Sequence, residues 1–439
     1  KREREGGYLG KTIQVIPHVV DEIKERIYAA TDDNDFLIIE LGGTVGDIEG
    51  LPFMEAIRSI RHELPKTNTM NIHLSLVPYI RAAGELKTKP TQHSVQELRR
   101  IGITPHMLVC RTERELPKIL KDKLALACDI DRNAVIEAGD AQSIYQVPLQ
   151  FIKEGILTPL SEHFNIKIKP NMEKWDTLVK NILVPQSEVT IAFVGKYLDL
   201  KESYKSLIEA LIHAGAHLNT KVNIHWCDSE RIEDVGAYEI IGNSDAILVA
   251  GGFGHRGVEG KLAAIKYARE NKVPYLGICL GMQLAIIEFA RNVLELEDAN
   301  SIEFDPNTKN PLIYLIDQFM DQNGDTQLRT HESPMGGTMR LGEYPFEPLK
   351  GTHLQKAYGN NDVYFERHRH RYEANPAYKE ALEKAGMIIS GQSNGLIEAV
   401  ELKDHPWFVG VQFHPEFTSH LETPNPIILE FVKQAVKNK

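Results

Sequence analysis

Short apolar runs alternate with longer amphipathic segments along most of this 439-residue sequence. In the second half, the strand-like runs are residues 189–195, 221–227, 245–252, 273–279, 395–402 and 407–413. Residues 201–215 are helix-like between two of them, with Leu207 and Leu211 on one apolar face. Apolar runs joined by such helices are typical of sheets buried on both faces. The sequence therefore predicts an α/β fold.

The first half shows the same alternation. Its strand-like runs are residues 12–17, 36–43, 70–80, 106–111 and 134–140, and helical segments precede the last two. Residues 167–188 carry prolines and mixed charge around a short helical stretch, which is typical of an interdomain linker. Because the chain is too long for one ordinary core, we expect two tandem α/β domains, 1–166 and 189–439, joined by this linker.

Composition excludes several classes of protein. A net charge of −11 argues against a broad nucleic-acid surface, and no apolar run is long enough to cross a bilayer. The four cysteines are scattered without CxxC spacing, which excludes a zinc knuckle and disfavours a disulfide framework. We expect a cytoplasmic protein without nucleic-acid or membrane partners.

The sequence GICLG places Cys279 between Gly277 and Gly281 after an apolar run. This is the cysteine counterpart of the GxSxG turn, in which glycines allow a sharp strand-to-helix connection that exposes the nucleophile. The following helix would direct its N-terminal N–H groups at the sulfur and favour the thiolate. A lone cysteine in an apolar strand is more often an inert core residue, as we expect for Cys110 and Cys128.

Two further segments support a catalytic cysteine. His414-Pro415-Glu416 follows a strand-like run, so that the imidazole could act as base while the carboxylate orients it. Gly251 and Gly252 follow another strand, where bare backbone N–H groups could stabilise an oxyanion together with that of Leu280. A papain-like protease is the competing interpretation, but the sequence around Cys279 lacks that local signature.

GGFG, GICLGMQ and HPE in this order resemble a class I glutamine amidotransferase. The resemblance implies that Cys279, His414 and Glu416 hydrolyse glutamine to glutamate and ammonia. It also implies a glutamine site formed by Gly252, Leu280, Gly281, Met282, Gln283, Glu303 and Arg371.

The first domain contains two motifs with nucleotide-binding chemistry. The run FLIIELGGTVGDIE would place Glu40 at the end of a buried strand, a common position for a Mg²⁺ ligand beside phosphates. A solvated acidic loop is the alternative. The sequence KTKPTQ, residues 87–92, brings ammonium and hydroxyl groups to a helix N-terminus and suits a triphosphate, although it could also be a solvated basic loop.

Taken together, GGTVGDIE, GELKTKPTQHS, GGFGHRGVEG, GTMRLG and ERHRHRYE resemble the CTP synthase family. The resemblance implies ATP-dependent amination of UTP in a homotetramer, with Mg²⁺ as cofactor, GTP as allosteric activator and CTP as feedback inhibitor. Glu40 would bind Mg²⁺, residues 254–260 with Arg256 would respond to GTP, and three residue sets would bind nucleotides. These are Lys87, Thr88, Lys89, Pro90, Thr91, Gln92 and Lys123 for UTP or CTP, Asp47, Ile48 and Glu49 for inhibitory CTP, and Gly139, Asp140 and Ala141 for ATP.

GGTVGD, residues 42–47, cannot serve as a phosphate loop, because it lacks the GK[ST] ending. The resemblance places the phosphate loop in roughly the first hundred residues of the family, which have no counterpart here. We therefore expect this stretch to retain glutamine hydrolysis, while activation of UTP needs the further segment. An amidotransferase with a different acceptor and a non-catalytic scaffold subunit are the alternatives.

Overall fold

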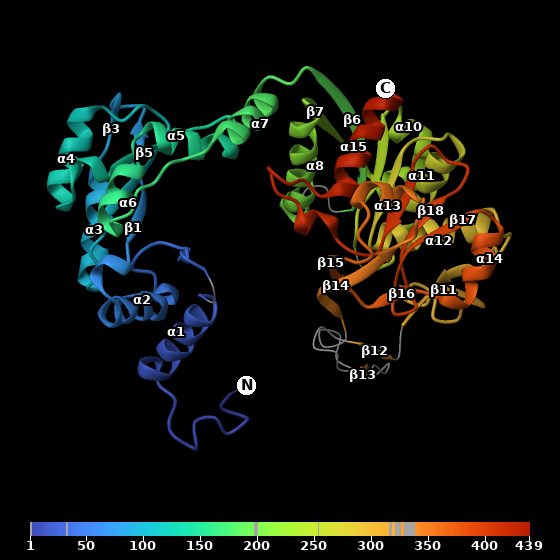
Figure 1. The fold of residues 1–439 in the computed structure, drawn as a ribbon, viewed down its shortest axis with the longest axis horizontal. Helices are drawn as coiled ribbons and strands as arrows, with labels where there is room; N and C mark the ends of the chain where they lie inside the picture. Colours follow the sequence, from blue (N-terminus) through green and yellow to red (C-terminus); the bar gives the residue numbers. More distant parts are fainter. Residues whose placement is uncertain are drawn as a thin grey trace. The chain divides into compact units, whose positions relative to one another are not determined.

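The computed structural model describes residues 2–31, 34–196, 201–252, 254–315, 318–320, 326–328 and 339–439. The chain forms two compact units, Lys1–Met172 and Glu173–Lys439 (Figure 1). The boundary falls within the segment predicted as a linker: α7 (Glu173–Leu183) packs on α8 (Lys205–His217) of the second unit. Phe253 of GGFG and residues 337–338 of GTMRLG lie outside the described residues.

The first unit is built on a parallel three-stranded sheet in the order β1-β4-β5. Its strands are β1 (Ile72–Leu76), β4 (Met107–Thr112) and β5 (Val135–Gly139). Apolar side chains of β4 alternate between two clusters, one under α3 and α4 and one under α5 and α6. The helices are α1 (Val20–Ala29), α2 (Leu51–Glu63), α3 (Lys89–Arg100), α4 (Lys118–Cys128), α5 (Val147–Lys153) and α6 (Leu157–Phe164), and a small hairpin joins β2 (Tyr79–Ile80) to β3 (Glu85–Leu86).

Two strand predictions in the first unit are wrong. Residues 36–43 form an extended, largely exposed segment, and Ile38 is 93% exposed. An apolar run becomes a strand only where a neighbouring strand can pair with it and a helix can cover it. The residues of the run itself do not show whether these partners are present. Residues 12–17 lead into the irregular turn η1 (Val15–Val19) before α1, where Pro17 has no N–H for a sheet.

The second unit contains a nine-stranded sheet in the order β15-β14-β17-β18-β19-β9-β8-β6-β7. The neighbouring strands from β7 to β19 are parallel, and those from β19 to β15 are antiparallel. Its strands are β6 (Ser187–Gly195), β7 (Thr220–Asp228), β8 (Ala246–Val249), β9 (Tyr275–Ile278), β14 (Arg340–Pro348), β15 (Tyr364–His370), β17 (Met387–Ser393), β18 (Leu396–Leu402) and β19 (Phe408–Val411).

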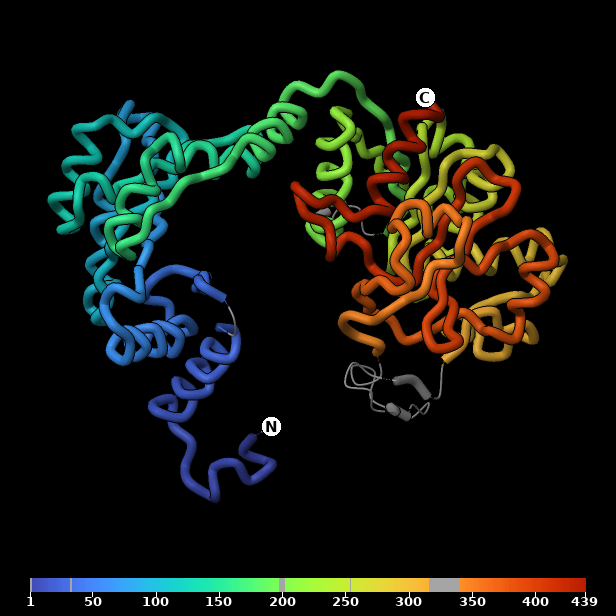
Figure 2. The backbone as a smooth tube through the Cα atoms, in the orientation of Figure 1, coloured from blue at the N-terminus to red at the C-terminus, as the bar shows by residue number. Residues whose placement is uncertain are grey.

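Helices cover both faces of this sheet, so successive side chains of β6 enter different cores: Ala192 and Val194 on one side, Ile191 and Phe193 on the other. One face is covered by α11 (Val258–Glu270) and α12 (Leu280–Asn292), the other by α8 and α15 (Pro426–Asn438). In Figure 2 the chain end, α15 in red, returns to the green start of this unit at β6 and α8. The predicted α/β architecture is confirmed.

Smaller elements complete the second unit. A three-stranded sheet, β10 (Ala299–Ser301), β11 (Asn310–Leu315) and β16 (Tyr372–Ala374), lies beside α12. The remaining elements are α9 (Ser229–Val235), α10 (Ala237–Ile241), α13 (His353–Tyr358), α14 (Lys379–Lys384), β12 (Gln318–Met320) and β13 (Thr326–Leu328). Among the described residues, no helix is long and apolar enough to cross a membrane.

Candidate active site

The turn between β9 and α12 holds Cys279 at the carboxyl edge of the parallel strands, where α/β proteins bind ligands. Cys279 has φ 53° and ψ −104°, a backbone conformation that a residue with a side chain rarely adopts. Its N–H donates to the carbonyl of Val411 at 2.7 Å, which ties the turn to the end of β19. The predicted strand-to-helix turn is therefore present.

The two glycines around Cys279 make this turn possible. A Cβ on Gly277 would lie 2.5 Å from the hydroxyl of Tyr275, and one on Gly281 would lie 2.3 Å from the carbonyl oxygen of Val249. Tyr275 also donates its hydroxyl to the carbonyl of Gly281 at 2.9 Å. Backbone atoms lie so close to both glycines that neither position has room for a side chain.

We expect Gly281→Ala to lower the free energy of unfolding of the second unit by about 2–3 kcal/mol, because the new Cβ overlaps backbone atoms of β8. All three tryptophans lie in this unit, so denaturant titration followed by tryptophan fluorescence reports on it. Lys437→Ala is the control, since Lys437 is an exposed residue of α15 in the same unit. An unchanged denaturation midpoint for Gly281→Ala would contradict the tight packing of the turn.

His414 and Glu416 lie directly after β19 and face Cys279. Nδ1 of His414 hydrogen-bonds Oε1 of Glu416 at 2.8 Å, and Cys279 lies close enough to the imidazole to raise its pKa. The N–H of His414 donates to the carbonyl of Arg367 at 2.8 Å, which fixes the residue against β15. The carboxylate holds one ring nitrogen, so the other is left for the sulfur.

The surroundings of His414 favour its charged form. Burial alone lowers the pKa of this imidazole, but the hydrogen bonds and negative charges of Cys279 and Glu416 outweigh it and raise the pKa to about 10. The imidazole therefore lies beside two groups that favour its charged form, and it is placed to exchange a proton with the sulfur.

The loop after β8 passes over the catalytic residues. A Cβ on Gly251 would lie 3.2 Å from Cε1 of His414 and 3.4 Å from Cβ of Cys279. The same test on Gly252 places a Cβ 3.8 Å from Cδ2 of Leu280. The structure thus brings together the predicted oxyanion glycines, the first residue of α12 and the sulfur.

The predicted glutamine-binding residues surround this centre in two groups. Residues 280–283 form the first turn of α12 and are buried, so Met282, which packs on Gly410, can offer substrate only its backbone. Glu303 accepts a hydrogen bond from the N–H of Gly254 at 2.9 Å. Burial raises the pKa of Glu303, while the positive charges of Lys196 and Arg371 oppose that rise. A carboxylate and cations thus lie close enough to recognise an amino acid's charged ends.

Sequence reasoning missed Gln412, which directly precedes Phe413 and His414. Its side-chain Nε2 donates to Sγ of Cys279 at 3.7 Å, and the residue is fully buried. Its position in VQFHPE could have suggested a role, because strand residues two apart point to the same side. Periodicity does not show which partner the amide meets.

In the first unit, the predicted UTP loop divides into exposed and buried parts. Lys87 and Lys89 are exposed, and Lys87 pairs with Glu85, whose pKa it lowers together with Lys123. Lys123 therefore lies near the loop, as a shared triphosphate site requires. By contrast, Thr88, Thr91 and Gln92 are buried within the protein: Gln92 donates to Thr88 at 3.1 Å, and Ser75 donates to Thr91 at 2.8 Å.

The other predicted nucleotide residues are separate in sequence and mostly exposed. Glu40 lies in the extended segment rather than at a strand end, and Asp47, Ile48 and Glu49 lead into α2. Asp140 follows β5 between Gly139 and Ala141 and pairs with Arg111 at 2.6 Å. Within the described ranges, no group of three or more His, Cys, Asp or Glu side chains is arranged to hold a metal ion.

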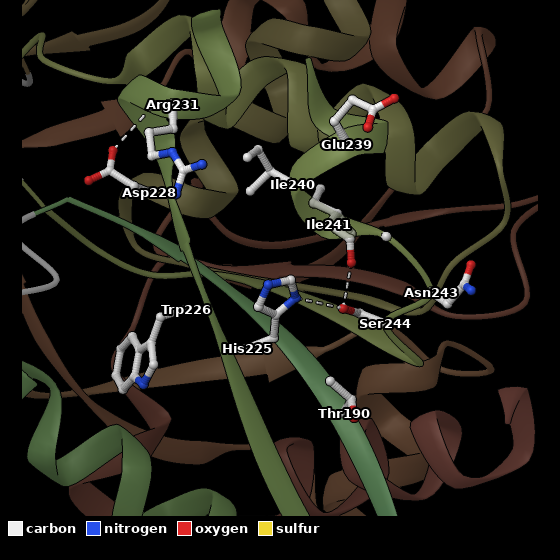
Figure 3. Close-up of a pocket in the computed structure, with 11 residues that line it drawn as sticks. Thr190, His225, Trp226, Asp228, Arg231, Glu239, Ile240, Ile241, Asn243 and Ser244 are labelled. Atoms are coloured by element: carbon white, nitrogen blue, oxygen red, sulfur yellow. Dashed lines mark hydrogen bonds between the residues drawn. The ribbon is translucent and has the colours of Figure 1, made fainter. Parts of the chain in front are cut away.

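A cavity of about 660 Å³ lies away from these residues, between β7 and the helices α9 and α10 (Figure 3). Its lining includes Arg231 and Glu239 together with His225 and Ser244, whose Nδ1 and Oγ atoms lie 3.4 Å apart. No predicted site residue lines it. Cavity size does not identify the catalytic centre here, because the reacting groups are held in a tight turn.

The fold and the Cys–His–Glu arrangement define a class I glutamine amidotransferase domain, and the family profile described as glutamine amidotransferase class-I matches residues 199–434. The profile described as CTP synthase N-terminus matches residues 1–166. CTP synthases of Sulfurimonas denitrificans and Wolinella succinogenes are both 65% identical to this chain. The matched segments make up 99% and 100% of this chain, respectively, and 80% of the length of each relative.

The glutaminase domain of Trypanosoma brucei CTPS, solved with bound acivicin, is 39% identical. It matches 57% of this chain and 95% of its own, with a TM-score of 0.52. The chain belongs to the CTP synthase family. The reaction of this family is the ATP-dependent amination of UTP to CTP with ammonia released from glutamine.

Proposed function

We propose that Cys279 is the nucleophile that releases ammonia from glutamine. Its thiolate attacks the carboxamide carbon, and the N–H groups of Gly252 and Leu280 stabilise the resulting oxyanion. The C–N bond breaks as His414 gives its proton to the leaving nitrogen. His414 then takes a proton from water, which cleaves the thioester to glutamate and restores the thiolate. Glu416 keeps the imidazole oriented throughout both steps.

The observation that carries this proposal is the geometry of Cys279, His414 and Glu416. The strained turn presents the sulfur, the 2.8 Å contact to Glu416 fixes the imidazole, and the raised pKa keeps that imidazole charged beside the thiolate. Glutamate release that depends on Cys279 tests it.

We propose that the remaining predicted site residues of the second unit recognise glutamine. Arg371 would bind the glutamine carboxylate, and Glu303 the ammonium group. Leu280, Gly281 and Met282 would contribute backbone groups, and Gln283 a side-chain oxygen. The electrostatic interaction between Glu303 and Arg371 supports a zwitterion between them.

In the first unit, we propose that Lys87, Lys89 and Lys123 bind the triphosphate of UTP or CTP, with Thr88, Pro90, Thr91 and Gln92 shaping the loop between them. The buried bonds of Thr88, Thr91 and Gln92 support this division, because they leave the ammonium groups as the exposed ligands. Inhibitory CTP would contact Asp47, Ile48 and Glu49. Gly139, Asp140 and Ala141 would lie by ATP.

Mg²⁺ is proposed as the cofactor, with Glu40 as its protein ligand. One exposed carboxylate beside Gly42 fits this ion, because Mg²⁺ near nucleotides is held mainly by phosphates and water. When bound, the ion would neutralise phosphate charge.

The proposal extends to regulation and assembly. GTP would activate the glutaminase through residues 254–260, where Arg256 now pairs with Glu230 and Gly254 donates to Glu303. The enzyme would act as a homotetramer in the cytoplasm, a location in keeping with its four free cysteines.

Replacing Lys87 with alanine should weaken UTP binding about 10-fold, because one charge-assisted phosphate contact is lost. Isothermal titration calorimetry with UTP measures this, and Lys66→Ala, which removes another exposed lysine of the same unit, is the control. Unchanged UTP affinity in Lys87→Ala would argue against the loop as triphosphate site. If the unaltered protein bound neither UTP nor CTP, a different acceptor would be favoured.

A further inference from the structure

A buried chain of hydrogen bonds connects the sulfur of Cys279 to the backbone beside Arg371. Gln283 uses its Nε2 twice, donating to the carbonyl oxygen of Tyr372 at 2.9 Å and to Oε1 of Gln412 at 2.9 Å. Gln412 then donates from its Nε2 to Sγ of Cys279 at 3.7 Å. Gln283 is 4% exposed and Gln412 0%, so water does not compete for these groups.

The direction of these bonds is fixed by the backbone. The carbonyl of Tyr372 can only accept, so the side chain of Gln283 must present its NH2 group to it. The second hydrogen of that NH2 group meets Gln412, which must therefore turn its oxygen toward Gln283. The NH2 group of Gln412 is then left facing the sulfur, so the amide acts as a donor to Cys279.

A donor in this position is suited to a thiolate. A hydrogen bond to an ionised acceptor is stronger than one to a neutral acceptor, and its strength increases when solvent is excluded. The N–H of Gln412 is also fixed, donating to the carbonyl of Glu398 at 2.8 Å, so the residue is held on both its backbone and its side chain.

We propose that Gln412 is a positioning residue that holds the Cys279 thiolate by a side-chain hydrogen bond, with its orientation set through Gln283 by the carbonyl of Tyr372. The inference rests on the proposed role of Cys279 as nucleophile. Both hydrogens of the Gln283 amide are used inside the protein, which fixes the side chain in one orientation.

The test compares Gln412→Glu and Gln412→Met, which keep the side-chain length but remove the amide donor. Alkylation of Cys279 by iodoacetamide is followed by peptide mass spectrometry from pH 5 to 10. We expect both variants to react about 10- to 100-fold more slowly at pH 7, with the half-maximal rate moved to higher pH. We also expect kcat for glutaminase to fall while KM for glutamine changes little, because the lost contact is to sulfur.

Gln392→Leu is the matched control, since Gln392 lies in the same sheet and accepts from Lys379 instead. Thermal melting shows which variants are folded. A folded Gln412 variant that alkylates at the unaltered rate across the pH range would overturn the inference. Loss of activity in Cys279→Ala with normal Gln412 variants would contradict this inference alone, whereas full activity in Cys279→Ala would contradict the proposed function.

Discussion

Replacing Cys279 with alanine is expected to lower glutamate release from glutamine by roughly 10⁴-fold or more, because no other group can form the thioester. The assay measures glutamate with the protein at fixed concentration and saturating glutamine. UTP binding should stay unchanged, since the predicted UTP residues belong to the other compact unit. A folded Cys279→Ala protein that keeps more than a small fraction of the glutaminase activity would show that the nucleophile lies elsewhere.

Cys227→Ala provides the matched control for the loss of a thiol. Cys227 is a fully buried cysteine of the same unit, and burial raises the pKa of its thiol to about 12. It is therefore uncharged at neutral pH and unreactive. We expect normal glutaminase activity per folded molecule in this variant. The comparison would then show that activity depends on the thiol at position 279 and not on the loss of a buried cysteine in general.

The fold class and the turn at Cys279 could be predicted because they depend on local sequence. Alternating apolar and amphipathic segments specify sheets covered by helices, and glycines on both sides of Cys279 allow the strained turn. The GxCxG pattern predicted that a side chain at Gly277 or Gly281 would clash, and the close packing of both residues agrees with this. The catalytic and binding roles stay predictions until they are measured.

Features that depend on tertiary partners could not be predicted in this way. Residues 36–43 are as apolar as a buried strand, yet they are exposed where no strand pairs with them in the described part of the chain. The side chains of Thr91 and Gln92, which are predicted to belong to the triphosphate site, bond to Ser75 and Thr88 inside the protein. Gln412 meets the sulfur only because β19 and β9 are adjacent. In each case the neighbour, rather than the residue, determines the role.

Replacing Glu416 with glutamine should lower kcat for glutaminase by about 10²- to 10⁴-fold, because the amide no longer fixes the imidazole as a carboxylate does. The pH profile should change as well. In the unaltered protein the pKa of His414 is raised from 6.5 to about 10, so the imidazole stays charged through neutral pH. The imidazolium–thiolate pair should be lost as pH rises toward 10.

Without the carboxylate, the pKa of His414 falls toward its ordinary value, and the basic limb of the kcat profile should move to lower pH. The free energy of unfolding also depends on the pKa of His414. A raised folded-state pKa contributes stability that is fully present below about pH 6.5 and is lost as pH approaches 10, so Glu416→Gln should reduce stability most below pH 6.5.

Glu422→Gln is the control for this comparison, because it removes an exposed carboxylate from the same C-terminal segment. Rates of glutamate release from pH 6 to 10 separate the two variants. If the basic limb stayed at the same pH in Glu416→Gln while kcat fell, Glu416 would act on geometry alone. If neither quantity changed, the 2.8 Å contact with Nδ1 would be structural, and the imidazole would owe its charge to Cys279.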